Sequence, residues 1–289
     1  MLTACGQQSE TELLVDTVSV ISPTEQKDET KEQVEAAAAE VNEKPDRLDE
    51  ELDQMLKNLA DQPGLAGGTW SIGVQPLGAA QCSVVNNQAM ESASLIKLFI
   101  AGAVAENMQL VQRMETYTGE TDTLMLRMLS ESDNQAANTL VGRLGGGSAQ
   151  AGMEIVNQFC AVHGYQDTSM GRLMLDFEAD ADNYTSVQDC CAFLSEVASG
   201  QAAGSASILD ALRQQTRTGK IPAGVPENVE TANKTGELTD VENDAAIVWL
   251  PDSAYILCII SNQLENAAMA REQIVSISAQ VYQYYAEAQ

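Results

Sequence analysis

The stretch SASLIKLFIAGAVA at residues 92–105 predicts a helix that is apolar on every face, and such a helix belongs in a domain core. Its single charge is Lys97, and burying an ammonium lowers its pKa unless a partner compensates. Ser94 lies three residues earlier on the same helix face, near the helix start, where free N–H groups favour developing negative charge. A hydroxyl beside a desolvated amine is an activated nucleophile. The alternative is a capping serine with a lysine that extends to solvent.

The composition limits the classes of partner. The chain has 289 residues, is 44% hydrophobic, and carries 42 Asp and Glu against 15 Lys and Arg, for a net charge of −27. An acidic surface repels phosphate backbones, which argues against nucleic acid as a partner. We find no apolar run of membrane-spanning length.

The first residues, Met1 to Gly6, resemble the end of a bacterial lipoprotein signal, in which a cysteine is cleaved and acylated. On this interpretation residues 1–5 are a signal remnant with a lipidated Cys5, and the polar, acidic residues 6–45 are a disordered tether. We therefore expect an extracytoplasmic protein that contacts the membrane only through its lipid anchor. The alternative is an incidental cysteine in a cytosolic protein.

The rest of the chain, 46–289, predicts one domain of α+β class. A helical stripe at 48–59 precedes a half-buried strand at 70–74 and a partner strand at 81–85. After the helices and an irregular loop at 171–184, three strands and a helix follow. Together these elements predict a two-lobed fold, with a five-stranded antiparallel sheet built from both termini, an inserted all-helical lobe and a cleft between them. The expected central helices lie at 92–105, 121–129, 135–141, 153–162 and 187–197, the later strands at 229–238, 243–250 and 254–261, and the last helix at 267–285.

Three motifs occur in order: Ser94-x-x-Lys97 on the buried helix, Ser132-Asp133-Asn134 on a turn between helices, and Lys234-Thr235-Gly236 on a strand. This set resembles that of the class A β-lactamases and related penicillin-recognising enzymes. The stretches 132–138, 218–226 and 243–249 match the family pattern as well. The resemblance covers the whole folded region and implies the β-lactamase/transpeptidase-like fold.

The chemistry of these groups agrees with the roles that the resemblance implies. Ser94 attacks a carbonyl carbon and becomes an acyl ester, and neutral Lys97 takes the hydroxyl proton. Ser132 relays a proton to the leaving nitrogen, with Lys234 near enough to assist. The backbone N–H groups of Ser94 and Glu237 form the oxyanion hole.

Four residues, Lys234 among them, bind substrate on the same interpretation. Asn134 offers its amide to the substrate's side-chain carbonyl. Lys234 and Thr235 hold the substrate carboxylate. Gly236 lets the substrate lie along the strand edge.

The pattern departs from class A in the loop that carries the deacylating base. The family's E-x-x-L-N is absent from residues 171–186, and Glu178 is the nearest candidate base, with an ordinary exposed acid as the alternative. The segment between Lys97 and Ser132 is also shorter than in typical class A enzymes. Both departures resemble D-Ala-D-Ala peptidases built on the same fold.

Three functions remain open: an active-serine hydrolase that opens β-lactams, a D-Ala-D-Ala peptidase that β-lactams inhibit, and a sensor that is acylated without turnover. The partner is therefore a β-lactam or a D-Ala-D-Ala peptide. We expect no cofactor, no metal and a monomeric protein. Cys160 is a candidate for a disulfide with Cys190 or Cys191, and the odd count with Cys82 and Cys258 leaves at least one free thiol.

Overall fold

The computed structural model describes residues 45–60 and 66–287. The predicted anchor Cys5 and all but the last residue of the predicted tether lie outside these residues. The elements, in chain order, are α2 (Pro45–Ala60), β1 (Thr69–Pro76), β2 (Ser83–Val85), β3 (Met90–Glu91), the 3₁₀ helix η1 (Ala93–Leu95), α3 (Ile96–Glu106), α4 (Met108–Gln112), α5 (Glu120–Ser130), α6 (Asn134–Leu144), α7 (Ala149–His163), β4 (Tyr184–Thr185), α8 (Val187–Ala198), α9 (Ser205–Arg213), the 3₁₀ helix η2 (Ile221–Gly224), β5 (Thr231–Leu238), β6 (Val241–Trp249), β7 (Ala254–Asn262) and α10 (Ala267–Glu287).

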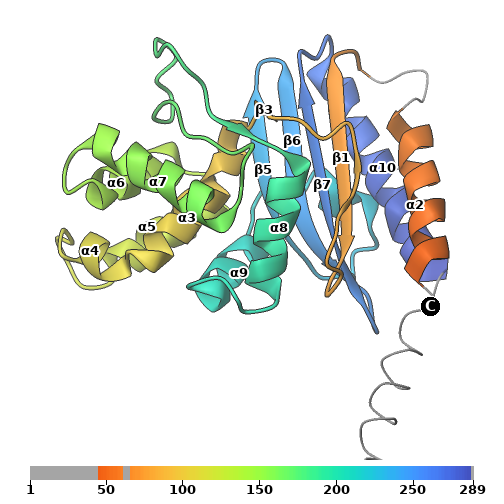
Figure 1. Ribbon diagram of the computed structural model, residues 1–289, viewed down its shortest axis with the longest axis horizontal. Helices are drawn as coiled ribbons and strands as arrows, with labels where there is room; N and C mark the ends of the chain where they lie inside the picture. Colours follow the sequence, from red (N-terminus) through yellow and green to blue (C-terminus); the bar gives the residue numbers. More distant parts are fainter. Residues whose placement is uncertain (1–44, 61–65, 288–289) are drawn as a thin grey trace, which may run out of the picture. The chain divides into compact units, whose positions relative to one another are not determined.

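Five strands form one antiparallel sheet in the order β2-β1-β7-β6-β5 (Figure 1). The first long strand therefore pairs with the last, and Thr69 lies opposite Asn262. This pairing confirms the predicted α+β fold with a sheet assembled from both ends of the domain. Strand β5, which carries Lys234, lies at the edge of the sheet beside the helical lobe.

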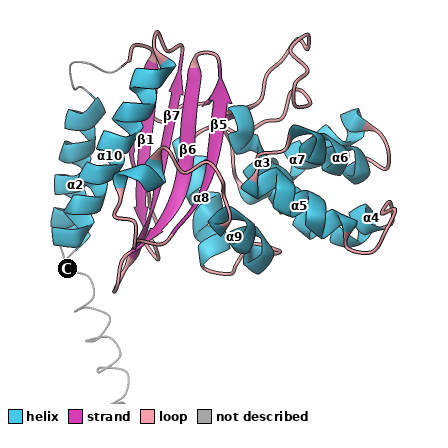
Figure 2. Cartoon of the chain, turned by 180° about the vertical axis from the view of Figure 1, so that it is seen from behind, coloured by secondary structure: helices cyan, strands magenta, loops and turns pink. Residues whose placement is uncertain are grey.

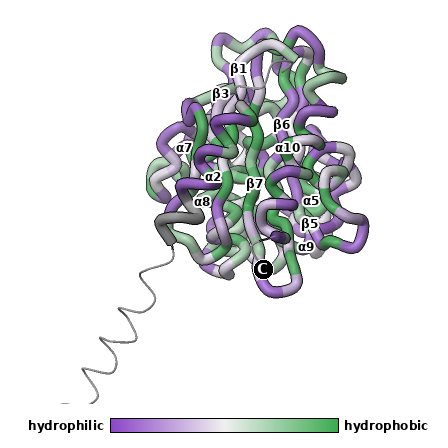
Figure 3. The backbone as a smooth tube through the Cα atoms, turned by 90° about the vertical axis from the view of Figure 1, so that its right-hand side faces the viewer, coloured by the Kyte–Doolittle hydropathy of each residue, from purple (hydrophilic) through white to green (hydrophobic). Residues whose placement is uncertain are grey.

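Helices cover both faces of the sheet (Figure 2). On one face α2 and α10 pack on Trp70, Ile72 and Val74. On the other face α8 packs so closely that a Cβ on Gly73 would lie 3.0 Å from the Cβ of Val187. Strand β1 is therefore buried on both faces. The expectation of a half-buried strand, which came from its alternating pattern, is wrong. Figure 3 shows the hydrophobic residues concentrated in inner strands such as β7.

The helical lobe is built around α3, as the apolar stretch predicts. Nine of the eleven residues of α3 are buried, including Lys97. The helix is shorter at its start than expected, because Ala93 has a φ of +46° and Ala93–Leu95 form a 3₁₀ turn. Ser94 thus lies in a tight turn directly before the helix. The short helix α4 and helix α9 were not among the helices expected from the sequence.

The cysteines follow a different arrangement from the predicted one. Cys82, Cys160, Cys190, Cys191 and Cys258 are all free thiols. Because Cys160, Cys190 and Cys191 are free, the expected disulfide from Cys160 to helix α8 is wrong. The thiols of Cys191 and Cys82 are hydrogen-bonded instead, as are those of Cys190 and Cys258. No helix within the described ranges is long and apolar enough to cross a membrane.

Candidate active site

Lys97 lies at the centre of a buried polar cluster. Its Nζ is 3.0 Å from Ser94 Oγ, 2.7 Å from the carbonyl oxygen of Ser132, 3.2 Å from Ser132 Oγ and 2.7 Å from Asn134 Oδ1. The side chain is fully buried, and burial lowers the pKa of Lys97 to about 7. A substantial fraction of the amine is therefore neutral at neutral pH, and a neutral amine has a lone pair that can accept the Ser94 proton.

The turn at residues 132–134 directs Asp133 to the start of helix α6, and Ser132 and Asn134 to Lys97. Ser132 has a φ of +60°, and Asp133 caps helix α6 by accepting a hydrogen bond of 2.9 Å from the backbone N–H of Ala136. Asp133 also forms an ion pair with Arg127, and its charge works to raise the pKa of Lys97 against the larger effect of burial. Because the Asp133 side chain caps helix α6, the contacts with Lys97 from this turn are made by Ser132 and Asn134.

A second buried lysine reaches the same hydroxyl from the sheet. Lys234 Nζ donates to Ser132 Oγ at 2.9 Å and to the carbonyl oxygen of Thr235 at 2.7 Å. Burial, and then the charge of Lys97, hold the pKa of Lys234 well below its usual value. Ser132 thus bridges two amines that come from opposite sides of the groove.

Gly236 explains how the sheet edge comes so close to Ser94. A Cβ at this position would lie 2.7 Å from the carbonyl oxygen of Ser92 and 3.2 Å from the backbone nitrogen of Ser94. No side chain fits in that space, so the glycine is required for strand β5 to approach the Ser94 turn. The structure places Ser94, Asn134 and Glu237 in the lining of one pocket, which is the predicted cleft.

The loop at 171–184 reaches this pocket without a carboxylate. Its lining residues are Arg172, Met174, Leu175 and Phe177. Glu178 is exposed and is not among the residues that line the pocket, so the structure does not bring this predicted base to Ser94. Asn138 fixes Met174 by donating to its carbonyl oxygen at 3.0 Å and accepting from its N–H at 2.8 Å.

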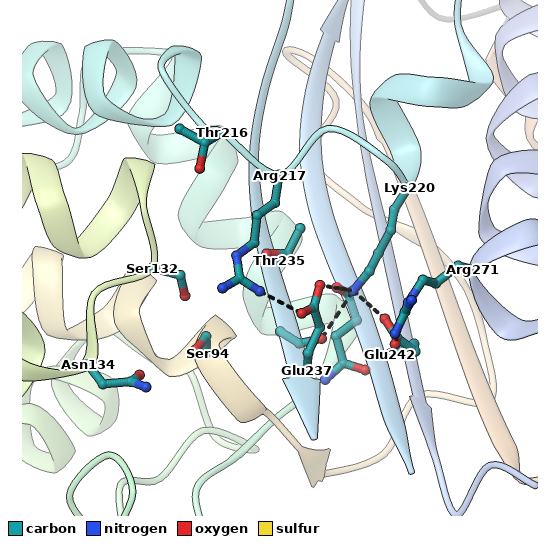
Figure 4. Close-up of polar contacts among 12 residues, drawn as sticks. Ser94, Ser132, Asn134, Thr216, Arg217, Lys220, Thr235, Glu237, Glu242 and Arg271 are labelled. Atoms are coloured by element: carbon teal, nitrogen blue, oxygen red, sulfur yellow. Dashed lines mark hydrogen bonds and ion pairs between the residues drawn. The ribbon is translucent and has the colours of Figure 1, made fainter. Parts of the chain in front are cut away.

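A network of charges that the sequence analysis did not single out borders the groove. Arg217 Nη1 lies 2.6 Å from Glu237 Oε2, and the buried Lys220 lies 3.3 Å from Glu237 Oε1 and 2.7 Å from Glu242 Oε2. Figure 4 shows Arg217 extending toward Glu237, with Ser132 and Thr235 beside it. Partial burial works to raise the pKa of Glu237, but Lys220 and Arg217 hold it below its usual value.

Arg217 also acts on the two buried amines, those of Lys97 and Lys234. Burial is the main cause of the lowered pKa of Lys97, the charge of Asp133 opposes it, and the charge of Arg217 lowers the pKa further. The charge of Arg217 also contributes, after larger effects, to the lowered pKa of Lys234. One signal in the sequence was available for finding it. The chain has only 15 Lys and Arg, so a cation in the stretch that leads to the Lys234 motif stands out.

The comparisons with known proteins agree with this site. Residues 49–285 match the model of the β-lactamase enzyme family, and the chain belongs to this family of hydrolases acting on β-lactams. A search of curated protein sequences finds no match.

Several solved structures share the fold. A point mutant of PBP-A, solved as an acyl-enzyme complex with penicillin G, has 22% identity, covers 83% of this chain and 97% of its own, and has a TM-score of 0.66. A β-lactamase from Sphaerobacter thermophilus DSM 20745 has 21% identity, coverages of 80% and 97%, and a TM-score of 0.67. A β-lactamase from Xanthomonas campestris pv. campestris str. ATCC 33913 has 20% identity, coverages of 82% and 98%, and a TM-score of 0.68. Identities this low carry the fold only.

Proposed function

We propose that this β-lactam hydrolase works through an acyl-serine intermediate on Ser94. The observation that carries the proposal is the contact of 3.0 Å between Ser94 Oγ and the buried amine of Lys97, whose pKa is about 7. A general base should have a pKa near the working pH, because it must be both unprotonated and basic. Lys97 meets both conditions.

The proposed acylation step uses the groups around Ser132. Ser94 Oγ forms a bond to the lactam carbonyl carbon while its proton passes to Lys97, and the C–N bond of the ring breaks. The nitrogen takes up a proton through the Ser132 hydroxyl, which Lys97 and Lys234 both contact. The N–H groups of Ser94 and Glu237 stabilise the oxyanion, and losing one such donor typically costs about 3 kcal/mol.

Substrate binding follows from the charges at the groove. Lys234, Thr235 and Arg217 offer donors to the substrate carboxylate, and Asn134 offers its amide to the side-chain carbonyl. The acyl-enzyme complex of the PBP-A mutant with penicillin G supports a β-lactam as substrate for this fold.

The test is intact-mass spectrometry after mixing with benzylpenicillin. We expect one adduct with the mass of the drug on the wild type and none on Ser94→Ala. The matched control is Ser207→Ala, an exposed serine on α9, which should react like the wild type. An adduct on Ser94→Ala would overturn the proposal.

A D-Ala-D-Ala peptidase is the second candidate, and one observation favours it. The loop residues that line the Ser94 pocket, Arg172, Met174, Leu175 and Phe177, carry no carboxylate that would activate a water. We therefore expect slow hydrolysis of a penicilloyl ester. Release of D-Ala from a D-Ala-D-Ala pentapeptide, without steady turnover of a chromogenic cephalosporin, would select this second function over the first.

The predicted location and assembly rest on sequence alone. We propose that Cys5 carries the lipid that holds the domain outside the cytoplasm, and that the domain is a monomer. Labelling with a radioactive fatty acid should mark the full chain but not its Cys5→Ser variant. Labelling of both would contradict the anchor.

A further inference from the structure

A separate cavity lies between helices α5 and α9, which run side by side (Figures 1 and 2). Its volume is about 250 Å³, and it shares no lining residue with the Ser94 pocket. This volume is just below that of pockets for drug-sized ligands, so the cavity suits one short chain or one ring. We call it the α5–α9 cavity.

Helix α9 is fixed at both ends, and the cavity lies between the two fixed points. At the start of α9, a Cβ on Gly204 would lie 2.9 Å from the Cβ of Ala105, so this end packs directly against the last turn of α3. Just beyond the other end, Gln215 Nε2 donates to the carbonyl oxygen of Leu129 in α5 at 2.8 Å. Between these contacts α9 lines the cavity with the small side chain of Ala211. The fold itself therefore maintains the opening.

The wall of the cavity is largely apolar. The side chains that form this wall are Met108, Met125, Leu126, Ile208 and Ala211. Leu126 is 38% exposed, so part of the apolar surface is open to solvent. Methionine side chains are flexible and adapt to the shape of a ligand. The wall thus suits an alkyl chain or an aromatic ring.

Two exposed carboxylates, those of Asp122 and Asp210, line the same cavity. Among the described residues Asp122 has no ion-pair partner. Asp210 lies 3.6 Å from Arg213, but that guanidinium lies closer to Glu230, at 2.5 Å, and over the ring of Trp249. Both carboxylates therefore remain available to a cation, on a chain whose net charge of −27 already attracts one.

We propose that the α5–α9 cavity binds an amphipathic cation. Its ammonium group would lie at Asp122 and Asp210, and its short alkyl or aryl group would lie against the methionines. Burial of the apolar group supplies affinity, and the two carboxylates add a preference for positive charge. An acid of the same length is repelled. The inference does not depend on the proposed reaction at Ser94.

The experiment titrates the full chain, labelled with ¹³C at its methionine methyl groups, with hexylammonium and three comparison probes. Hexan-1-ol has the chain without the charge, hexanoate has the opposite charge, and methylammonium has the charge without the chain. NMR follows the methyl signals of Met108 and Met125, which line the cavity and are assigned by Met→Leu replacement.

We expect hexylammonium to shift both methyl signals. It should bind about fivefold tighter than hexan-1-ol, which is the effect of two exposed ion pairs, and about tenfold or more tighter than hexanoate. Methylammonium should bind about 10²-fold more weakly than hexylammonium, because it buries no chain.

The variants assign the charge preference to the two carboxylates. Asp122→Asn combined with Asp210→Asn should weaken hexylammonium binding about fivefold and change hexan-1-ol binding by less than about twofold. The matched control, Glu227→Gln combined with Asp252→Asn, removes two exposed charges elsewhere and should bind hexylammonium like the wild type. Leu126→Ala should weaken both probes by about threefold, because it removes part of the apolar wall.

Three results would overturn the inference. Methyl signals of Met108 and Met125 that do not move would show that the cavity is not the binding site. Hexan-1-ol or hexanoate binding as tightly as hexylammonium would remove the role of the carboxylates. Equal losses in the Asp122/Asp210 variant and in its control would show that only the net charge attracts the cation. Both aspartates are exposed, so their replacement tests binding without removing a core side chain.

Discussion

The proposed acylation centre and the loop at 171–184 meet at one pocket, which Ser94 and Asn134 line from the centre, and the two regions are built in opposite ways. In the centre Lys97 and Lys234 are fully buried, and both bond the hydroxyl of Ser132. In the loop Leu175 and Phe177 face solvent, and the loop is fixed through the backbone of Met174. We infer from this difference that the groups proposed to form an acyl ester are preorganised, whereas the loop residues that line the pocket supply no carboxylate for hydrolysing that ester.

The largest effect is expected from removing the base. Lys97→Gln should slow acylation by benzylpenicillin by about 10²–10⁴-fold, the usual contribution of general acid–base catalysis. Stopped-flow mixing followed by mass spectrometry measures this rate. Lys57→Gln, at an exposed lysine of α2, is the matched control and should behave like the wild type. A Lys97→Gln variant that acylates at the normal rate would show that another group takes the proton.

The second prediction supplies the loop with the group it lacks. Met174 lines the Ser94 pocket, so Met174→Glu places a carboxylate beside the ester. Hydrolysis of the acyl-enzyme should accelerate by about 10²-fold through general-base activation of water. The decay of the adduct mass after removal of free drug measures it, with Met269→Glu on α10 as the control. Unchanged decay would mean that the loop does not direct its residues at the ester.

The third prediction concerns pH. Acylation requires neutral Lys97, so its rate should rise as pH passes through about 7. The charge of Arg217 contributes to lowering this pKa, so Arg217→Gln should raise the pKa of Lys97 and move the acid limb of the pH profile to higher pH. Rates of adduct formation on either side of neutral pH would measure the shift. Movement to lower pH, or none, would remove Arg217 from the electrostatics of the centre.

The smallest effect is expected at the base that the sequence suggested. Glu178 is exposed and is not among the residues that line the pocket, so Glu178→Gln should change acylation and hydrolysis by less than about twofold. The same decay measurement applies. A much slower decay would restore Glu178 as the deacylating base.

The acylation centre could be predicted because its chemistry is local in the sequence. Ser94 and Lys97 are three residues apart, and the 3₁₀ turn that leads into α3 keeps Ser94 Oγ within 3.0 Å of Lys97 Nζ. The three-motif order then predicted that Ser132 and Lys234 meet them. The alternation and length of the five strands also predicted them correctly. The exposed face expected for β1 is instead covered by α8.

The loop and the ion pairs could not be predicted in the same way. The position of Met174 depends on Asn138, 36 residues earlier, and no periodic pattern records such a bond. The contact of Arg217 with Glu237 likewise joins two positions 20 residues apart. Helix α8 directs Cys191 at Cys82, a pairing that the spacing of the cysteines alone does not distinguish from the others.

One time course tests the central claim most directly. The mass of the protein is followed from milliseconds to hours after mixing with one equivalent of benzylpenicillin. The measurement is made at two pH values, about one unit below and one unit above the Lys97 pKa of about 7. We expect a stoichiometric adduct on Ser94 that forms faster at the higher pH and is then hydrolysed slowly. An adduct on another residue, or adduct formation at the same rate at both pH values, would contradict the proposed role of Ser94 and Lys97.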